Sequence, residues 1–395
     1  MKVVLSYSGG LDTTVAVRWL QEKYGAEVVT VTVDVGQGDD FKEVEERAYK
    51  SGAVKHFFID AKERFVNEYI SKSIKANGLY EETYPLSTAL SRPLIAEEVA
   101  KIALREKADA VAHGCTGKGN DQIRFDVTFA AVAPKLKIIA PVREWNMSRD
   151  AEIEYALKNN LPIKVKESKF SIDENLWGRS IEAGELEDPW NEPPPEAFKY
   201  VAPLDKAPDK PEEIVVGFED GVPTSLNGEA MKLIDIIKKL NVIGGRHGFG
   251  IIDHIEDRVV GLKSREVYEA PAALLLTMAH KDLEKMVLGR RFLDFKKDVE
   301  KLWSNMVYSG LWLDPLMKAL NAFIDESQKN VSGEVRIKLY KGSARIVGRR
   351  AEKPLYSPEL ITYTSKSAFD QRAGEAFARL WGLETKLSRM REGGG

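Results

Sequence analysis

The sequence predicts an α/β protein that begins with a doubly wound parallel sheet. Up to about residue 165, short β-branched runs alternate with longer amphipathic stretches, and this alternation is typical of strands joined by helices. Such connections are right-handed, and they give a parallel sheet with helices on both faces. Because the 395 residues exceed the roughly 250–300 at which a single core stops growing, we expect a second domain.

The predicted elements of the first domain follow one another in order. Strands are expected at residues 2–8, 27–36, 55–61, 109–115 and 137–143. Helices are expected at residues 13–25, 41–52, 67–78, 95–108, 122–133 and 150–160. Three of these helices end at Gly25, Gly52 and Gly78, where a left-handed cap residue is expected.

Proline marks the passage into the second domain. Seven of the 17 prolines lie between Pro189 and Pro211. Since proline lacks an amide donor and fixes φ, we interpret this stretch as a wrap or linker and not as a helix or central strand. Beyond it, hairpins are expected at residues 212–228 and 333–350, around an Asp-Gly pair and Gly342, with helices between them. This pattern indicates an α+β domain.

A charged helical pattern from Ala368 to about Arg391 forms the last predicted element, a C-terminal helical arm. Its apolar residues fall on one face: Phe369, Ala373, Phe377, Leu380 and Leu387. We expect this helix to pack on another subunit because it stands apart from the predicted cores. The predicted divisions of the chain are therefore residues 1–165, 166–365 and 366–395.

Composition excludes several classes of protein. Lysine and arginine total 58 against 61 acidic residues, so the chain lacks the strong positive field that nucleic-acid binding requires. The lone cysteine, Cys115, rules out a disulfide framework and favours a reducing compartment. No stretch approaches the ~20 apolar residues of a membrane span. We therefore expect a cytoplasmic protein that binds small molecules and contacts neither nucleic acid nor membrane.

The first glycine-rich loop follows the first strand in "SYSGGLDTT", residues 6–14. In a doubly wound sheet, ligands bind at the carboxyl ends of the strands, and glycines let backbone amides approach an anion at the start of a helix. Asp12 repels a phosphate unless a cation lies between them, which predicts Mg²⁺. The alternative is structural: Ser8 and Asp12 cap a helix after a tight turn.

This loop matches neither a P-loop nor a dinucleotide site, since it lacks a Lys followed by Ser or Thr and lacks a third glycine. Its S-G-G-x-D form resembles the pyrophosphate loop of ATP pyrophosphatases, which cleave ATP between the α- and β-phosphates. A second glycine-rich loop lies within residues 112–126 and contains Gly114 and Lys118. We predict the strand order 3-2-1-4-5, in which the two loops face each other. Taken alone, the second loop is more typical of a surface turn.

Longer segments resemble the argininosuccinate synthase family, in the family's own order. They are "YSGGLDTT", "VDVGQG", "YPLSTALSRP", "HGCTGKGNDQIRF", "SIDENLWGRSIEAG" and "GRHGFGIIDHIEDRVVGLKSREVYEAPA". The resemblance covers essentially the whole chain. It implies an AMP-forming ligase that uses ATP and Mg²⁺ to join L-citrulline and L-aspartate. The implied product is argininosuccinate, formed through a citrullyl-adenylate in arginine biosynthesis.

The resemblance also implies roles for residues and domains. It assigns ATP to Ser6, Tyr7, Ser8, Gly9, Gly10, Leu11, Asp12, Thr13, Thr14, Val33, Gly114 and Lys118. It assigns aspartate to Thr116, Asn120 and Asp121, and citrulline to Tyr84, Thr88, Asn120, Arg124, Ser171, Ser180, Glu256 and Tyr268. The expected catalytic residues are Asp12, which also contacts the metal, Asn120 and Arg124. The implied assembly is a homotetramer of three-part subunits: a nucleotide-binding domain (1–165), a synthetase and multimerisation domain (166–365) and a C-terminal oligomerisation helix with its tail (366–395).

Without the resemblance, several of these residues have plain structural interpretations. Ser171 and Ser180 are typical of turns or caps, and Glu256 lies in a charge cluster that favours solvent. We interpret the five histidines as structural, because they lack a metal-ligand spacing. The alternative functions are another ligase that cleaves ATP between the α- and β-phosphates, such as an ammonia-dependent synthetase or a tRNA-modifying adenylase, and a nucleotide-binding signalling module. The lone Cys115 argues against fused glutaminases and thiolating enzymes.

Overall fold

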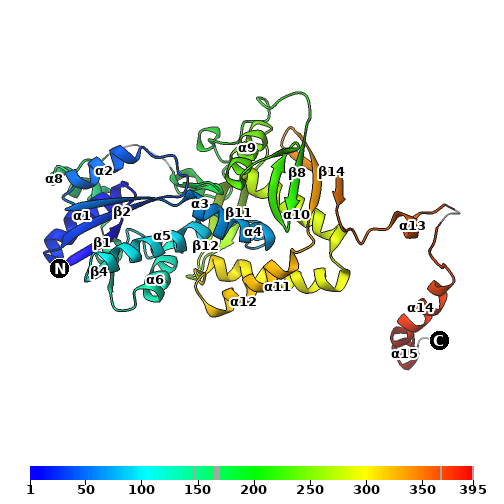
Figure 1. Ribbon diagram of the computed structural model, residues 1–395. Helices are drawn as coiled ribbons and strands as arrows, with labels where there is room; N and C mark the ends of the chain where they lie inside the picture. The colour runs from blue at the N-terminus through cyan, green and yellow to red at the C-terminus, as the bar shows by residue number, and fades with distance from the viewer. Residues whose placement is uncertain (146, 164–169, 365–366, 394–395) are drawn as a thin grey trace. The chain divides into compact units, whose positions relative to one another are not determined.

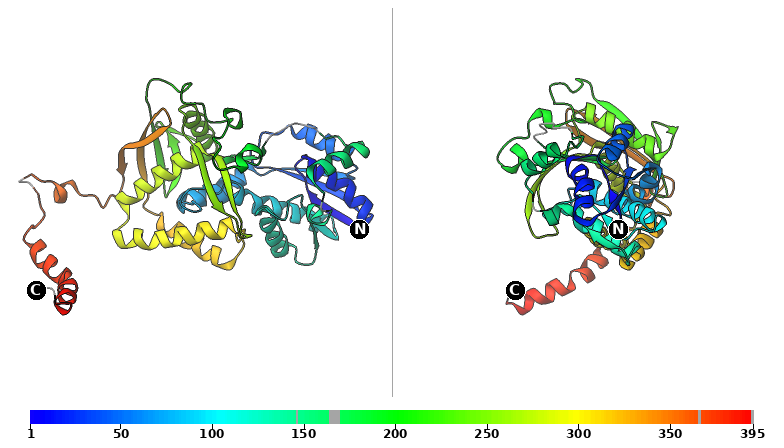
Figure 2. Two further views of the ribbon diagram at one scale, coloured as in Figure 1. Left: turned by 180° about the vertical axis from the view of Figure 1, so that it is seen from behind. Right: turned by 90° about the vertical axis from the view of Figure 1, so that its left-hand side faces the viewer.

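The computed structural model describes residues 1–145, 147–163, 170–364 and 367–393 (Figure 1). The chain divides into two compact units, Met1–Lys353 and Pro354–Gly395. Within the first unit, a parallel α/β lobe and a mainly antiparallel lobe lie side by side (Figure 2). One continuous cluster of buried apolar residues runs from Val4 in the first lobe to Leu339 in the second. The two lobes therefore share a core.

The first lobe is built on five parallel strands in the order β3-β2-β1-β4-β5, which confirms the predicted sheet. The strands are β1 (Lys2–Ser6), β2 (Glu27–Asp34), β3 (Lys55–Asp60), β4 (Ala110–Ala112) and β5 (Lys137–Ile139). The central strand is β1, where Val4 pairs with Val29 of β2 and Val111 of β4. Its middle residues are buried on both faces, as expected for a strand covered from both sides.

Helices of this lobe cover both faces of the sheet, with one exception. They are α1 (Leu11–Tyr24), α2 (Phe41–Lys50), α3 (Lys62–Arg64), η1 (Phe65–Ile70), α4 (Ser71–Lys75), α5 (Ser87–Arg105), α6 (Asp121–Val132), α7 (Pro141–Trp145) and α8 (Arg149–Lys158). The exception is α4, which contacts α10 (Pro271–Val287) and α12 (Pro315–Ser327) of the second lobe. Val4 packs in the cluster that contains α5, whereas its neighbours Val3 and Leu5 pack with α1 and α2. This alternation follows from the period of two along a strand, and it confirms the doubly wound arrangement.

The predicted glycine caps have different outcomes. At the end of α1, Gly25 is left-handed (φ 58°), as predicted. Gly52 has a positive φ (106°) one residue beyond the cap of α2. After α4, however, the left-handed residue is Asn77 (φ 47°) and the prediction for Gly78 is wrong. Gly78 is needed for space instead, because a Cβ there would lie 2.6 Å from the Trp303 ring.

The second lobe contains two antiparallel sheets. One has the order β11-β12-β7-β6, from β6 (Ser171–Asn175), β7 (Gly178–Glu182), β11 (Ile251–Asp257) and β12 (Lys263–Glu269). The other has the order β10-β9-β8-β13-β14, from β8 (Glu212–Glu219), β9 (Val222–Leu226), β10 (Glu229–Ala230), β13 (Gly333–Tyr340) and β14 (Ser343–Ala351). Both predicted hairpins are confirmed, with positive φ at Asp220 and Gly221 in one and at Lys341 and Gly342 in the other. Such pairs are typical of tight hairpin turns.

Helices of the second lobe pack against these sheets and against the first lobe. They are α9 (Leu233–Arg246), α10 (Pro271–Val287), α11 (Arg290–Tyr308) and α12 (Pro315–Ser327), with the short turns η2 (Gly184–Glu187) and η3 (Pro195–Ala197). The buried helix α5 contacts β1 in the first lobe and both β6 and β7 in the second, so it links the two. Within the described ranges, no helix is long and apolar enough to cross a membrane.

Over residues 368–391 the structure has two helices, α14 (Ala373–Trp381) and α15 (Leu383–Arg391), where the sequence predicts one. The C-terminal unit also contains α13 (Pro358–Ile361). Gly382 separates α14 from α15, since glycine weakens a helix interior. The predicted apolar face is therefore divided: Phe369 lies before α14, while Phe377 and Leu387 lie on different helices.

Candidate active site

The first glycine-rich loop connects β1 to α1 at the carboxyl end of the central strand. Helix α1 begins at Leu11, and its N-cap is Gly10, with no side-chain hydrogen bond at the cap. Ser8 Oγ accepts a bond from the Gly10 amide (3.3 Å) and not from an amide within the helix. Asp12 lies inside the first turn. The structural alternative, in which Ser8 and Asp12 cap the helix, is therefore wrong.

Contacts from behind hold this loop in place. Gly9 is left-handed (φ 74°), and its carbonyl accepts a hydrogen bond from Arg47. A Cβ on Gly9 would lie 3.3 Å from Val44 of α2. The hydroxyls of Tyr7 and Thr14 lie 3.2 Å apart in the buried region under the loop. These contacts occupy one side of the loop and leave the other side to line a cavity.

A cavity of about 460 Å³ opens beside the loop. Nine of the residues assigned to ATP line it: Ser6, Tyr7, Ser8, Gly10, Leu11, Asp12, Thr13, Val33 and Gly114. Gly9 and Thr14 do not line the cavity, because Gly9 contacts Arg47 and Thr14 contacts Tyr7. Lys118 is exposed and lies outside the lining, with its carbonyl 3.5 Å from Arg258.

Gln37 is a further lining residue that the sequence does not single out. Its side chain donates to the Val33 carbonyl (3.0 Å) and accepts from the Val35 amide (2.9 Å). The backbone at Val33, which the resemblance assigns to ATP, is therefore held in place by the Gln37 side chain.

The second glycine-rich loop faces the first, as predicted. It joins β4 to α6, and a Cβ on Gly114 would lie 2.8 Å from Thr13 Cγ2. His113 holds the start of this loop, since one ring nitrogen accepts from the Cys115 amide (3.1 Å) and the other lies 2.9 Å from Asp126. This contact gives His113 the structural role predicted for it. The interpretation of the loop as an isolated surface turn is wrong.

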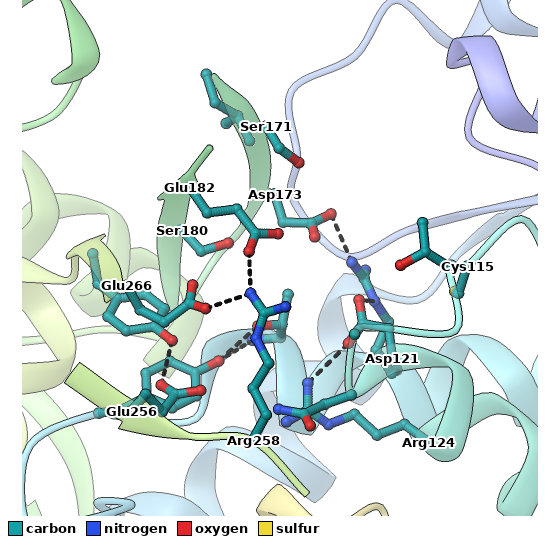
Figure 3. A pocket seen from close by; sticks show the side chains of 18 of the residues that line it. Cys115, Asp121, Arg124, Ser171, Asp173, Ser180, Glu182, Glu256, Arg258 and Glu266 are labelled. Carbon is teal, nitrogen blue, oxygen red and sulfur yellow. Dashed lines mark hydrogen bonds and ion pairs between the residues drawn. The ribbon is translucent and has the colours of Figure 1, made fainter. Parts of the chain in front are cut away.

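A second cavity, of about 300 Å³, adjoins the first (Figure 3). Every residue assigned to aspartate or citrulline lines it: Tyr84, Thr88, Thr116, Asn120, Asp121, Arg124, Ser171, Ser180, Glu256 and Tyr268. The two cavities share Asp12, Arg92, Gly114, Cys115, Ile172 and Asp173. Groups bound in the two cavities therefore meet at Asp12 and Gly114.

Glu256, on β11, is a buried acid surrounded by hydroxyl groups. Its carboxylate accepts hydrogen bonds from the hydroxyls of Tyr268 (2.6 Å) and Tyr308. Burial alone raises the pKa of this carboxyl, but the His254 ring 3.4 Å away and the hydrogen bonds from the two tyrosines lower it more, so the net pKa lies below its usual value. Glu256 is therefore a buried anion suited to an ammonium group.

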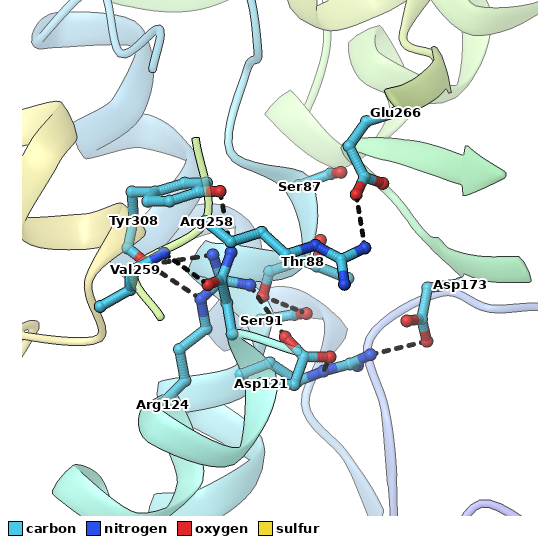
Figure 4. Close-up of polar contacts among 12 residues, drawn as sticks. Ser87, Thr88, Ser91, Asp121, Arg124, Asp173, Arg258, Val259, Glu266 and Tyr308 are labelled. Atoms are coloured by element: carbon cyan, nitrogen blue, oxygen red, sulfur yellow. Dashed lines mark hydrogen bonds and ion pairs between the residues drawn. The ribbon is translucent and has the colours of Figure 1, made fainter. Parts of the chain in front are cut away.

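Asp121 is held between two arginines (Figure 4). Arg92 Nε donates to one carboxylate oxygen (2.6 Å), and Arg124 Nη1 donates to the other (2.8 Å). Arg92 also pairs with Asp173 (2.6 Å). Burial raises the pKa of Asp121, but the charges of the two arginines lower it by more, so the net pKa lies below its usual value. Asp121 is therefore ionised and orients both arginines.

Part of the Arg124 guanidinium is available to bind a ligand. Nε and Nη2 donate to the Tyr308 carbonyl (3.0 and 2.9 Å), and Nη1 donates to Asp121. A guanidinium has five N–H donors, so one N–H on each terminal nitrogen is left unpaired within the described part of the chain. Two such donors fit a carboxylate.

Five charged residues of the smaller cavity escape the sequence prediction. Arg258 Nη2 lies 2.6 Å from Glu182 and 2.8 Å from Glu266. Burial and the Glu266 charge raise the pKa of Glu182 to about 7, although Arg258 opposes them. The other two are Arg92 and Asp173. Arg92 is a charged residue in an otherwise small and apolar part of α5, which is the one signal that the sequence offers for it.

Asp12 lies beside a second acid, Glu152 of α8. Burial and Asp12 raise the pKa of Glu152 to about 8, and one Glu152 oxygen is buried without a hydrogen-bond partner among the described residues. Across the same residues, no group of three His, Cys, Asp or Glu side chains could hold a metal. A cation at Asp12 therefore needs further oxygen ligands, such as those of phosphate.

The fold and the site together define a class of protein. A parallel sheet of this order, with two glycine-rich loops at the carboxyl ends of its strands and a polar pocket of amino-acid size beside a larger cavity, is typical of a nucleotide-dependent ligase.

Comparison with known proteins identifies the family. A model described as "Arginosuccinate synthase N-terminal HUP domain" matches residues 2–162, and one described as "Arginosuccinate synthase C-terminal domain" matches residues 170–388. Relatives named argininosuccinate synthase occur in Pyrococcus furiosus (57% identical over 98% of this chain and 94% of the relative), Pyrobaculum aerophilum (57%; 99% and 98%) and Dehalococcoides mccartyi (54%; 98% and 95%). The chain belongs to the argininosuccinate synthase family, and it is an ATP-dependent ligase.

Proposed function

We propose that this site joins L-citrulline to L-aspartate at the expense of ATP, giving argininosuccinate, AMP and pyrophosphate in arginine biosynthesis. The observation that carries the proposal is that the two cavities share Asp12, Arg92 and Gly114. ATP on the first loop and citrulline at Glu256 and Arg124 then meet at this junction. Holding two reactants in contact converts an encounter in solution into a step within one complex.

The reaction needs ATP because the carbon of a urea group is a poor electrophile. The ureido oxygen of citrulline attacks the α-phosphorus, and pyrophosphate leaves. This step forms a citrullyl-adenylate, in which the oxygen has become part of a leaving group. The aspartate amine, once deprotonated, attacks the ureido carbon, and AMP leaves with that oxygen. Loop amides at the start of α1 favour the negative charge of the phosphates during the first step.

Citrulline is proposed to bind by both ends of its amino-acid group. Glu256 is a buried anion for the α-ammonium group, and the two unpaired N–H groups of Arg124 suit the α-carboxylate. The remaining lining residues supply hydroxyls around the same molecule: Tyr84, Thr88, Ser171, Ser180 and Tyr268. This arrangement leaves the ureido group to point toward the shared junction.

Aspartate is proposed to bind at Thr116, Asn120 and Asp121, on and after the second glycine-rich loop. Arg92 supports this assignment, since it is held by Asp121 and Asp173 and lines both cavities. A fixed guanidinium at this place favours a carboxylate. Asn120 lines the amino-acid cavity next to Arg124 and is proposed to orient both amino acids.

We propose that Asp12, with Glu152 behind it, contacts Mg²⁺ held by the phosphates. Two adjacent carboxylates, with one buried oxygen unpaired in the described residues, fit a divalent cation that shares its coordination with a ligand. When bound, Mg²⁺ offsets the charge of the pyrophosphate leaving group.

We further propose a cytoplasmic homotetramer. The lone Cys115 supports a reducing compartment. The C-terminal unit supports subunit association, because α14 and α15 have exposed apolar side chains: Phe377, Leu380, Trp381, Leu383, Leu387 and Met390. Exposed apolar side chains gathered on one short segment mark an interaction site.

The test of the reaction is pyrophosphate release from ATP with one substrate omitted at a time. Release should require citrulline, and argininosuccinate should form only when aspartate is added, as measured by mass spectrometry. Release that is equally fast without citrulline, or that depends on ammonia or tRNA, would favour the alternative ligases. ATP binding without release in any mixture would favour a signalling module.

A further inference from the structure

We propose that Tyr308 is a positioning residue of the amino-acid pocket. Its hydroxyl orients Glu256 and Asn120, and its carbonyl and ring orient Arg124. The inference rests on the proposed function, because it takes citrulline as the molecule that Glu256 and Arg124 hold.

The hydroxyl of Tyr308 joins two residues of the pocket. Tyr308 is the last residue of α11, and its side chain is fully buried. Its hydroxyl donates to Glu256 and accepts from Asn120 Nδ2 (2.8 Å). The directions are set because an ionised carboxylate only accepts hydrogen bonds, so the single phenol proton must go to Glu256. Burial and the Glu256 charge raise the pKa of Tyr308, so the phenol keeps this proton.

The chain of hydrogen bonds continues beyond Asn120. The Val259 amide, in the turn between β11 and β12, donates to Asn120 Oδ1 (2.9 Å). This bond fixes which end of the Asn120 amide faces Tyr308. The hydrogen bonds therefore run from Val259 through Asn120 and Tyr308 to Glu256, and one amide N–H of Asn120 stays available for a substrate.

The backbone and ring of Tyr308 hold Arg124 (Figure 4). The Tyr308 carbonyl accepts two hydrogen bonds from the guanidinium, at 3.0 and 2.9 Å, and the guanidinium carbon lies 5.1 Å from the ring centroid. The next turn fits closely as well, because a Cβ on Gly310 (φ 77°) would lie 2.9 Å from Arg124 Cα. The end of α11 is therefore packed directly on α6.

Two other tyrosines hold the Tyr308 ring. Tyr80 stacks on it with centroids 3.5 Å apart and planes within 3° of parallel, and Tyr84 meets it edge-on at 6.4 Å. The hydroxyl of Tyr308 therefore has a fixed direction. A phenylalanine fills the same space and keeps the carbonyl, so Tyr308→Phe removes the contacts to Glu256 and Asn120 but leaves those to Arg124.

The test compares Tyr308→Phe with a matched control, Tyr69→Phe. Tyr69 is also buried, and its hydroxyl donates to a carboxylate, that of Glu97 (3.3 Å), outside both cavities. Citrulline binding is measured by calorimetry in the presence of α,β-methylene-ATP, which is not cleaved. Y308F should raise the citrulline Kd about tenfold or more, the scale of a lost hydrogen bond to a charged group. Y69F should leave this Kd unchanged, and neither variant should change nucleotide affinity.

A second ligand separates positioning from general damage. 5-Ureidopentanoate is citrulline without the α-amino group, so it has no ammonium for Glu256. Y308F should weaken the binding of this analogue less than it weakens citrulline, because only the contact through Asn120 is affected. Equal weakening of citrulline and the analogue would show a merely structural role and would overturn the proposal, as would unchanged citrulline binding by Y308F.

A double-mutant cycle covers the case in which Y308F is less stable than Y69F. In a Glu256→Gln background, adding Y308F should raise the citrulline Kd by a smaller factor than in the wild type, because the ammonium contact is already lost. Additive losses would overturn the proposal. A wild-type protein that does not bind citrulline at all would instead reject the proposed function on which the inference rests.

Discussion

Asp121 connects the two amino-acid sites through its arginine partners. Its carboxylate holds Arg92 on one side and Arg124 on the other. Arg124 is also held by the Tyr308 carbonyl, whereas the other protein partner of the Arg92 guanidinium is Asp173 among the described residues. Loss of the Asp121 charge should therefore disturb the aspartate side of the pocket more than the citrulline side.

Asp121→Asn keeps the shape of the side chain and removes this charge. We expect argininosuccinate formation to fall about tenfold or more, with a smaller loss in the citrulline-dependent exchange of pyrophosphate into ATP. Radiolabelled pyrophosphate measures the exchange, and mass spectrometry measures the product. Asp150→Asn, on the exposed side of α8, serves as the control. Equal losses in both assays would show that Asp121 acts in the first step too.

Glu182 makes the stability of the fold depend on pH. Burial and Glu266 raise its folded pKa to about 7, above the ordinary value of 4.5. Between these values the folded chain keeps a proton that the unfolded chain has released, so stability falls as pH rises through this window. Glu182→Gln should remove this loss. The unfolding temperature of the variant minus that of the wild type should be larger at pH 8 than at pH 5.

Differential scanning calorimetry at the two pH values measures this effect. The exposed Glu192→Gln variant is the control, and its difference from the wild type should not change with pH. If the difference for Glu182→Gln were the same at both pH values, the raised pKa of Glu182 would not contribute to stability.

The two glycine-rich loops form one site because they pack directly on each other. A Cβ on Gly114 would lie 2.8 Å from Thr13 Cγ2, whereas a Cβ on Gly117 of the same loop would meet its nearest atom, in Arg143, at 3.8 Å. Gly114→Ala should push the loops apart and weaken ATP binding about tenfold, at the cost typical of overpacking. Gly117→Ala should leave ATP binding unchanged.

Calorimetric titration with α,β-methylene-ATP measures both variants, and thermal melting shows whether the fold is intact. Similar nucleotide affinities for the two variants would mean that the loops can separate without loss of the site.

Several apolar side chains are buried in α12, but those of the C-terminal arm are exposed. Buried residues of α12, such as Met317 and Ile324, belong to the shared core, whereas the apolar residues of α14 are exposed. If this surface joins subunits, Phe377→Ser with Leu380→Ser should lower the mass of the assembly in solution. Multi-angle light scattering should give four chains of 44.2 kDa for the wild type and fewer for the double variant.

Glu375→Gln with Arg379→Gln is the matched control. It removes the ion pair on the same helix (2.7 Å) and leaves the apolar side chains in place, so the mass should stay at four chains. An unchanged mass in the apolar double variant would show that another surface joins the subunits.

Much of the fold and the identity of the pocket residues could be predicted from the sequence. The strand order and both glycine-rich loops are confirmed, and all residues assigned to the two amino acids line one cavity. The continuous helix at residues 368–391 and the cap at Gly78 are wrong. A glycine can provide a left-handed cap or space for a neighbouring side chain, and which of the two it does depends on residues that are distant in the sequence.

The sequence by itself determined the parallel sheet, the two loops and the family, because periodicity and turn residues act over a few bonds and because long motifs are specific. Tertiary structure alone decided how the pocket is organised. Tyr308 and Arg124 are 184 positions apart, and Arg258 and Glu182 are 76 apart, so their contacts exist only once both lobes have packed on the shared core. Side-chain direction and charge pairing between such distant residues depend on that packing and not on any local pattern.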